Sequence, residues 1–171
     1  AIALTKIKNC EIIGMDLSSN MLDIGNKKIK ELGLQQSVIL ELGDVENLEY
    51  TDNYFDVVTV GYGVRNFENL KKSLDEIYRV LKENGTLIIL ETSVPKNKII
   101  KLLYNFFTKF YVKLIGLLLS KNFEAYSYLQ KSALNFPHGD EFINILKKSK
   151  FTNTSQDLKL FGASTIYVAN K

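Results

Sequence analysis

Short apolar runs alternate with amphipathic segments along the first part of the chain. Four runs have the length and composition of buried strands: residues 10–15, 37–42, 55–60 and 86–90. Two stretches between them place apolar residues at steps of three and four, as one buried helix face requires: residues 18–32 and 69–82. Strands that alternate with amphipathic helices form a parallel sheet covered by helices. The pattern therefore predicts an α/β fold.

The alternation ends after Glu91. The segment 97–149 is predicted to be a helical insertion that acts as a lid. Residues 151–161 and 165–169 have the pattern of two strands joined at Gly162 and Ala163. A link this short permits only antiparallel pairing. We therefore expect a single domain over the whole chain, whose sheet ends in an antiparallel strand pair.

The lysines of residues 98–120 limit what this long apolar stretch can do. They fall on one helical face, while aliphatic and aromatic side chains cover the rest. A transmembrane helix needs about 20 residues with few or no charges, so the stretch is amphipathic and does not span a membrane. Two interpretations remain: a lid with its apolar side buried, or a surface that contacts a membrane or admits a lipid substrate.

The composition fits one globular domain and excludes several kinds of site. Of the 171 residues, 46% are hydrophobic and 24% are charged, which is enough to bury a core. The formal net charge of +3 is too small to indicate nucleic-acid binding. One cysteine, Cys10, and one histidine, His138, exclude an internal disulfide and a cysteine-rich metal site, so no metal is expected.

Acidic residues and glycines follow the predicted strands, where open parallel sheets bind their ligands. Asp16 could accept hydrogen bonds from two ribose hydroxyls, or it could cap the next helix or place a charge at its first turn. Asp44 could meet an adenine amino group, or it could form a turn with Gly43. Gly61 and Gly63 allow either close approach of the backbone to a ligand or a tight turn. The residues alone leave these alternatives open.

Arg65 and Asn66 place a guanidinium next to a carboxamide at the mouth of this predicted site. Arg65 could bind an anionic or enolate-like oxygen through two N–H groups, and Asn66 could orient a water or a phenol. Alternatively, Arg65 pairs with a surface carboxylate such as Glu68, and Asn66 caps the following helix. The contacts of the two side chains distinguish these alternatives.

Four segments together resemble the ubiquinone/menaquinone biosynthesis C-methyltransferase family, and the similarity extends over essentially the whole chain. They are IIGMDLSSNML (12–22), GDVENL (43–48), YFDVVTVGYGVRNFENLKKSLDEIYRVLKENGTLIILE (54–91) and AYSYLQKSALNFP (125–137). The GxRN and YxYLxxSxxxFP patterns discriminate best. The resemblance implies a class I, Rossmann-like methyltransferase fold and S-adenosylmethionine as the cofactor. It also implies methyl transfer to a ring carbon of a prenylated quinol.

The resemblance assigns cofactor-binding roles to four residues. Asp16 corresponds to the acid that binds the ribose of S-adenosylmethionine, and Asp44 and Val45 correspond to the pair that contacts adenine. Gly61 occupies a position at which relatives commonly have serine, so a hydroxyl contact is expected to be lost here.

The resemblance also assigns residues to the quinol end of the site. Arg65 and Asn66 are expected to stabilise the phenolate or to deprotonate the phenol through a water. Tyr126, Tyr128 and Phe136 are expected to line the quinol pocket.

One part of the family pattern is expected to be missing. The cofactor loop, D-x-x-x-G-x-G-D, would stand immediately before Ala1, and no G-x-G pattern occurs before Cys10. The strand that carries this loop would be the central one of the sheet, between the strands that contain Ile12 and Val58. Without it, two strand edges would face a gap, and the chain's own affinity for the cofactor would be weak.

The expected partners are the prenylated quinol, a membrane surface contacted peripherally through residues 98–120 from the cytoplasmic side, and a second copy in a homodimer. Nucleic acid is not expected. Whether the acceptor is a naphthoquinol or a benzoquinol stays open. Two rival hypotheses are a methyltransferase with another small-molecule acceptor and a non-catalytic nucleotide-fold subunit of a lipid-biosynthetic assembly.

Overall fold

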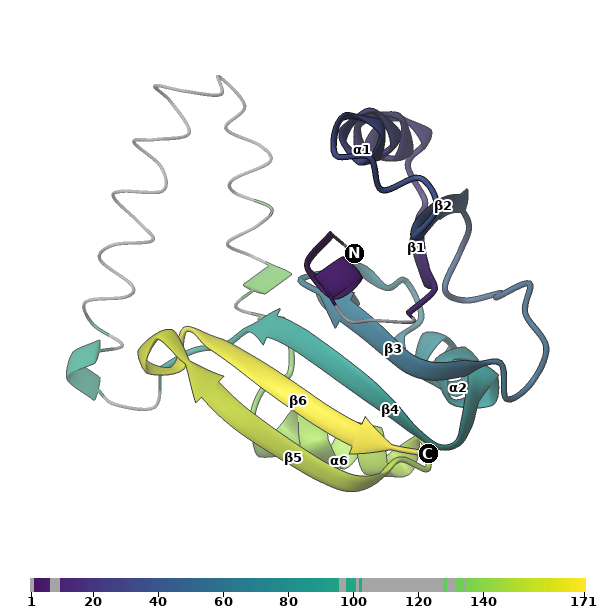
Figure 1. Cartoon of the computed structure of the whole chain (residues 1–171). Helices are drawn as coiled ribbons and strands as arrows, with labels where there is room; N and C mark the ends of the chain where they lie inside the picture. The colour runs from purple at the N-terminus through teal and green to yellow at the C-terminus, as the bar shows by residue number, and fades with distance from the viewer. Residues whose placement is uncertain are drawn as a thin grey trace. The chain divides into compact units, whose positions relative to one another are not determined.

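The computed structural model describes residues 2–6, 10–95, 98–100, 102, 128, 132–133 and 135–171 (Figure 1). These residues form two compact units, Ala1–Glu49 and Tyr50–Lys171, and each is described by itself. The predicted lid over residues 97–149 and the stretch 98–120 lie largely outside the described residues, and Tyr126 lies outside them entirely. None of the helices that the structure describes is both long and apolar enough to cross a membrane.

The first unit is a parallel strand pair with one connecting helix. Its elements are η1 (Ile2–Lys6), β1 (Ile12–Asp16), α1 (Ser19–Glu31) and β2 (Val38–Leu42). The strands run in parallel with Ile12 opposite Val38, as the alternation of strand and helix predicts. Ile12, Ile29 of α1 and Val38 form a buried apolar cluster.

Two glycines let α1 approach the strands closely around one leucine. A Cβ atom added at Gly25 of α1 would lie 2.5 Å from Leu40 Cδ1, and one added at Gly14 of β1 would lie 2.7 Å from Leu40 Cδ2. The Leu40 side chain therefore fills the space that both glycines leave open, which brings helix and strand into close contact.

The second unit is built on a four-stranded mixed sheet in the order β3-β4-β6-β5. Its strands are β3 (Phe55–Gly61), β4 (Leu81–Thr92), β5 (Thr152–Lys159) and β6 (Ser164–Asn170). β3 and β4 are parallel, whereas β6 is antiparallel to both β4 and β5. The short 3-10 turn η5 (Leu160–Gly162) links β5 to β6. The predicted antiparallel pair at the end of the chain is therefore confirmed.

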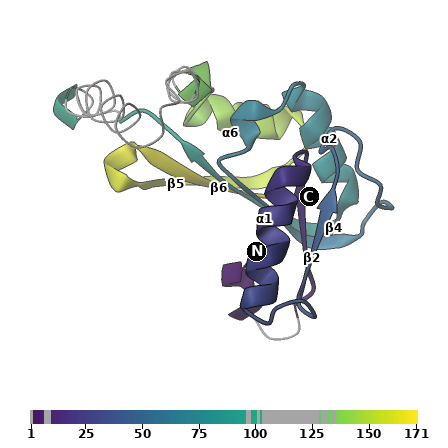
Figure 2. The same ribbon diagram turned by 90° about the horizontal axis from the view of Figure 1, so that it is seen from above.

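Helices α2 (Leu70–Val80) and α6 (Asp140–Lys148) cover one face of this sheet, as Figure 2 shows. Alternate residues of β4 and β6 are buried on that face, and Ile89 stands opposite Tyr167. Phe142 of α6 is fully buried and meets the Tyr167 ring edge-on at 4.8 Å. The core of this unit therefore lies between the sheet and these two helices.

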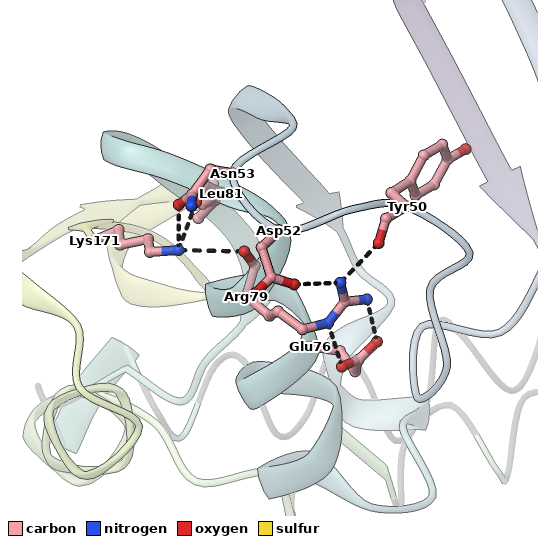
Figure 3. A network of polar contacts seen from close by, with 7 residues as sticks. All are labelled: Tyr50, Asp52, Asn53, Glu76, Arg79, Leu81 and Lys171. Carbon is pink, nitrogen blue, oxygen red and sulfur yellow. Dashed lines mark hydrogen bonds and ion pairs between the residues drawn. The ribbon is translucent and has the colours of Figure 1, made fainter.

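The C-terminal end of α2 is fixed to the chain segment that precedes β3. The Arg79 guanidinium donates two hydrogen bonds of 2.8 Å to the carboxylate of Glu76. It also donates to Asp52 at 2.9 Å and to the carbonyl oxygen of Tyr50 at 2.7 Å (Figure 3). The hydrogen bonds to the two carboxylates hold the pKa of Arg79 well above its usual range. Arg79 therefore stays charged and orders the entry to the sheet.

Lys171 joins the end of the chain to the same region. Its ammonium group donates to the side chain of Asn53 at 2.8 Å, to the carbonyl of Leu81 at 2.8 Å and to that of Arg79 at 3.2 Å. Figure 3 shows the Arg79 side chain extending from α2 toward Tyr50 and Asp52, and Lys171 approaching the carbonyl groups of Arg79 and Leu81. Lys171 therefore satisfies carbonyl groups at the C-terminal end of α2.

The helix predicted over residues 69–82 ends earlier in the structure. Leu81 takes an extended conformation with ψ of 138°, so α2 stops at Val80 and β4 follows directly. Asn84 has a positive φ of 63°, and a Cβ atom at Gly85 would lie 2.7 Å from the carbonyl oxygen of Lys82. The predicted Asn84–Gly85 turn therefore falls within the β4 range instead of ending the helix.

The described strands pair in two separate sheets. β1 pairs with β2, and β3 pairs with β4, and in the described part of the chain neither β1 nor β3 has a second strand neighbour. A strand between them, as expected from the family pattern, stays a prediction.

Candidate active site

Asp16 ends β1 with an exposed carboxylate that is held by a local turn. Its Oδ1 atom accepts a hydrogen bond from the backbone N–H of Ser18 at 2.9 Å. The helix cap is Ser18, whose hydroxyl accepts from the N–H of Met21 at 3.4 Å. Asp16 as the cap of α1 is therefore wrong. The role of Asp16 at a ribose stays a prediction, and it needs the exposed carboxylate that the structure shows.

Asp44 lies at the same edge of the strand pair as Asp16. The N–H of Gly43 donates to the carbonyl oxygen of Asp16 at 3.2 Å, which joins the two strand ends. The Asp44 carboxylate accepts from the N–H of Glu46 at 2.8 Å, and its carbonyl accepts from Asn47 at 3.0 Å. The chain therefore turns at Asp44, as predicted, but the turn runs from Asp44 to Asn47 and does not include Gly43. The adenine contacts assigned to Asp44 and the following Val45 stay predictions.

S-adenosylmethionine fits this edge at its ribose end. Asp16 and Asp44 are both exposed, and each carboxylate accepts a backbone hydrogen bond through its Oδ1 atom. Among the described residues neither Oδ2 atom has a hydrogen-bond donor, so both are available to hydroxyl or amino donors, in the place where open parallel sheets bind nucleotides.

Gly61 ends β3 opposite Leu90 of β4. A Cβ atom added there would meet no atom within 4 Å, so packing does not require a glycine at this position. The positive φ of this turn belongs to the next residue, Tyr62, at 55°, and the Tyr62 N–H donates to the carbonyl of Leu90 at 2.7 Å. The tight turn is therefore centred on Tyr62, and the cofactor role of Gly61 stays a prediction.

Arg65 forms a buried ion pair with Glu91, the last residue but one of β4. Its Nη1 atom lies 2.6 Å from Glu91 Oε1, and the side chains are 9% and 0% exposed. The same Nη1 donates to the carbonyl of Tyr62 at 2.8 Å. The alternative in which Arg65 pairs with a surface carboxylate such as Glu68 is therefore wrong. Arg65 is the middle residue of the short 3-10 helix η2 (Val64–Asn66), which contacts β4.

Glu91 has hydrogen bonds to both of its carboxylate oxygens. Oε1 also accepts from the N–H of Thr92 at 2.7 Å and from the Thr92 hydroxyl at 3.1 Å. Oε2 accepts from the backbone N–H of Arg65 at 3.4 Å. A fully buried carboxylate needs such partners, because an unpaired charge in the interior is strongly unfavourable.

Asn66 is exposed and contacts a residue far along the chain. The Tyr128 hydroxyl donates to Asn66 Oδ1 at 3.1 Å. The cap of α2 is instead Asn69, whose side chain accepts from the N–H of Lys72 at 3.0 Å. Asn66 as a helix cap is therefore wrong. The structure brings together Asn66 and Tyr128, two residues assigned to the quinol end, although their function stays a prediction.

Phe136 belongs to the core of the second unit. It is 6% exposed, and its ring lies 5.0 Å from that of Phe142. Its assignment to the quinol pocket stays a prediction. The pocket assignment of Tyr126 falls outside the described residues.

The residue that sequence reasoning left without a role is Glu91. The signal was present: an acidic side chain directly follows the apolar run TLIIL, at the end of a strand that faces the core. A buried hydroxyl network nearby carried no such signal. In it, the Thr165 hydroxyl donates to Ser93 Oγ at 2.8 Å, and Ser93 donates to the carbonyl of Gly162 at 2.8 Å.

Solved S-adenosylmethionine-dependent methyltransferases share this fold. Phosphoethanolamine N-methyltransferase 2 of Haemonchus contortus, solved in complex with S-adenosyl-L-methionine, gives a TM-score of 0.69 at 16% identity, covering 99% of this chain and 45% of that one. A SAM-dependent methyltransferase of Aquifex aeolicus gives 0.65 at 14% identity, covering 99% and 74%. At these identities the similarity shows the fold alone, which is that of a class I, Rossmann-like methyltransferase.

The chain belongs to the ubiE/COQ5 methyltransferase family, whose sequence model matches residues 1–171. The demethylmenaquinone methyltransferase of Bacteroides fragilis is 38% identical over 161 residues, which are 94% of this chain and 66% of that protein. The enzyme of the same name from a Geobacillus species is 37% identical over 161 residues, 94% of this chain and 68% of that protein. The chain thus spans about two thirds of the length of these relatives, and the predicted family is confirmed.

Proposed function

We propose that this protein transfers a methyl group from S-adenosylmethionine to a ring carbon of a prenylated quinol in respiratory quinone biosynthesis. Membership of the ubiE/COQ5 methyltransferase family over the whole chain supports this most strongly. The names of the relatives favour demethylmenaquinol, a naphthoquinol, as the acceptor. The cluster of Arg65, Glu91, Asn66 and Tyr128 supports it at the level of residues.

At the cofactor end, the residues of the β1–β2 edge bind and orient S-adenosylmethionine. Asp16 accepts hydrogen bonds from the ribose hydroxyls, and Asp44 and Val45 contact the adenine. S-adenosylmethionine, when bound there, supplies an electrophilic methyl group. The protein contributes by holding this group in line with the acceptor carbon and by excluding water.

At the quinol end, Arg65 and Asn66 act on the ring hydroxyl next to the carbon that is methylated. The positive guanidinium of Arg65 stabilises the phenolate form, or Arg65 and Asn66 orient a water that takes the proton. The phenolate would donate electron density to the neighbouring ring carbon, which could then accept the methyl group as the methyl–sulfur bond breaks. Loss of the proton from that carbon and return of a proton to the oxygen would restore the aromatic quinol. Tyr128 holds the Asn66 carboxamide through their hydrogen bond of 3.1 Å.

A prenylated acceptor resides in a membrane, and we extend the proposal to peripheral contact with its surface through residues 98–120. Most of that segment lies outside the described residues, but Ile99 and Leu102 are 72% and 71% exposed. Side chains of this kind partition into the interface of a bilayer. Cosedimentation with vesicles that contain anionic lipid tests the contact, and an Ile99→Asn, Leu102→Asn variant is expected to bind them more weakly.

An assay of methyl transfer tests the proposed activity. The 171-residue chain and the protein translated from the complete reading frame that encodes it are each given S-adenosylmethionine with demethylmenaquinol, with the corresponding benzoquinol, or with unrelated phenols. We expect turnover with the prenylated quinols. Arg65→Ala is expected to lower kcat by about 10²–10³-fold, as loss of one oxyanion-stabilising donor does in other enzymes.

Preference for an unrelated phenol would favour a methyltransferase with another acceptor. Full turnover by the Arg65→Ala variant would remove Arg65 from the mechanism. An absence of methyl transfer to every acceptor would favour a non-catalytic subunit.

A further inference from the structure

One nitrogen of the Arg65 guanidinium is held by hydrogen bonds, and a second nitrogen has an N–H group without an acceptor. Its Nη1 atom makes two hydrogen bonds, to the carbonyl of Tyr62 and to the carboxylate of Glu91. Its Nε atom is buried and has no hydrogen-bond acceptor among the described residues. A buried N–H group without an acceptor is unfavourable, so this donor is ready to bind an oxygen atom that enters the site.

Glu91 accepts hydrogen bonds from both the side chain and the backbone of Arg65. One carboxylate oxygen accepts from the side-chain Nη1 at 2.6 Å, and the other accepts from the backbone N–H of Arg65 at 3.4 Å. Thr92 occupies Oε1 with two further hydrogen bonds. Because the protein engages both oxygens and the side chain is fully buried, Glu91 itself does not reach a ligand.

We propose that Glu91 is the positioning residue for Arg65 and that it directs the Nε–H group of Arg65 toward the phenolate oxygen of the acceptor. The inference rests on the proposed function for the identity of that oxygen. The ion pair also lets a positive charge stay buried at the site, because an isolated guanidinium would be strongly disfavoured there. Substrate would then meet an N–H donor that is already in place, without reorganisation of the side chain.

The first test is the mobility of the Arg65 side chain, which does not depend on turnover. The chain has two arginines, Arg65 and Arg79, so ¹⁵N labelling of arginine gives two Nε–H signals that an Arg79→Lys variant assigns. We expect the Arg65 signal to show a rigid side chain in the unmodified protein and to broaden in Glu91→Gln. The matched control, Glu83→Gln, removes an exposed carboxylate from the same strand and should leave the signal unchanged. An equally rigid Arg65 in Glu91→Gln would overturn the proposal.

The second test is a double-mutant cycle on methyl transfer, using the protein that gives turnover. Glu91→Gln is expected to lower kcat by 10-fold or more while KM for S-adenosylmethionine stays within 3-fold. In an Arg65→Met background the same change should lower kcat no further, because Glu91 acts through Arg65. Independent, multiplicative losses in the double variant would contradict this coupling.

A conservative variant covers the case in which Glu91→Gln does not fold. Glu91→Asp keeps the charge that pairs with Arg65 but withdraws the carboxylate by one methylene. We expect it to fold with a broadened Arg65 signal and a reduced kcat. Unmodified kcat together with a rigid Arg65 would overturn the proposal. If the unmodified protein methylates no quinol but Arg65 loosens on removal of Glu91, the proposed function fails and the positioning of Arg65 by Glu91 stands.

Discussion

Tyr167 joins the sheet to the helical layer through a single hydroxyl group. Its side chain is 1% exposed, and its hydroxyl accepts a hydrogen bond from the N–H of Gly139 at 2.8 Å. Gly139 has a positive φ of 66° and stands at the N-terminus of α6. Burial raises the pKa of the Tyr167 phenol above its usual value of about 10, although the hydrogen bond from Gly139 acts in the opposite direction.

Tyr167→Phe is expected to lower the free energy of unfolding by about 1–3 kcal/mol at pH 8, because it leaves the buried Gly139 N–H without an acceptor. The difference in the free energy of unfolding between the unmodified protein and Tyr167→Phe should narrow above about pH 10. A phenol whose pKa is raised in the folded state contributes its full stability below the unfolded-state pKa and loses it as pH rises through the folded-state pKa. Urea denaturation at pH 8 and at pH 10.5 measures this. Parallel stability profiles for the two proteins would contradict the assignment.

Arg65 and Asn66 show how much of the candidate site a sequence can predict. Their residue types and position after β3 marked them as candidates, and the turn at Asp44 followed from local rules. The hydrogen-bond partners of the two residues could not be predicted from the sequence, because Glu91 is 26 residues from Arg65 and Tyr128 is 62 residues from Asn66. Contacts of this range depend on strand order and on helix placement, which local periodicity does not encode.

The N-terminal cap of α2, Asn69, and the nearby site residue Asn66 have roles that mutations can test separately. Asn69→Ala is expected to cost about 1 kcal/mol of stability, because the Asn69 side chain satisfies the N–H of Lys72. Asn66→Ala removes a side chain of the same type that is exposed and caps nothing, so its stability should change by less than about 0.5 kcal/mol. Turnover should respond in the opposite way, falling for Asn66→Ala alone. Equal losses of stability in thermal and urea unfolding would argue against this division of roles.

Gly85 in β4 and Gly61 at the end of β3 test how closely other atoms pack against the backbone of the sheet. Gly85→Ala is expected to cost about 1–3 kcal/mol, because its Cβ would lie 2.7 Å from the carbonyl oxygen of Lys82 and the backbone must shift. Gly61→Ala is the matched control, since its Cβ would meet nothing within 4 Å. We expect its stability to stay the same or to rise slightly, because alanine loses less conformational freedom than glycine on folding. Denaturant midpoints measure both, and a Gly61→Ala loss as large as that of Gly85→Ala would contradict the structure.

The ends of the elements were harder to predict than their existence. Apolar runs located the four strands β1 to β4, and the helix predicted over residues 18–32 contains α1. The end of α2 was placed two residues late, because Leu81 continues the helical spacing of apolar residues while its backbone is already extended. Leu81 is fully buried in its extended conformation. An apolar residue suits a buried helix position as well as a buried strand position, so its hydrophobicity does not reveal which conformation it adopts.

For the molecule as a whole, the family match and the fold agree with the alternation of strands and helices. The hydrophobic pattern predicted a parallel sheet with an antiparallel end, and the pairings of β3, β4, β5 and β6 have that form. The family could be identified because its motifs are dense in the segment 54–91. The acceptor could not be identified from the residues, since the shape of a pocket depends on packing between distant segments.

The structure of the methylated product tests C-methylation by this protein most directly. The protein from the complete reading frame is incubated with demethylmenaquinol and S-adenosylmethionine that carries a ¹³C-labelled methyl group, and the product is analysed by NMR and mass spectrometry. We expect one labelled methyl group, bonded to a ring carbon. A labelled methyl on oxygen, or no labelled quinol under conditions in which a demethylmenaquinone methyltransferase of known activity forms it, would contradict C-methylation by this protein.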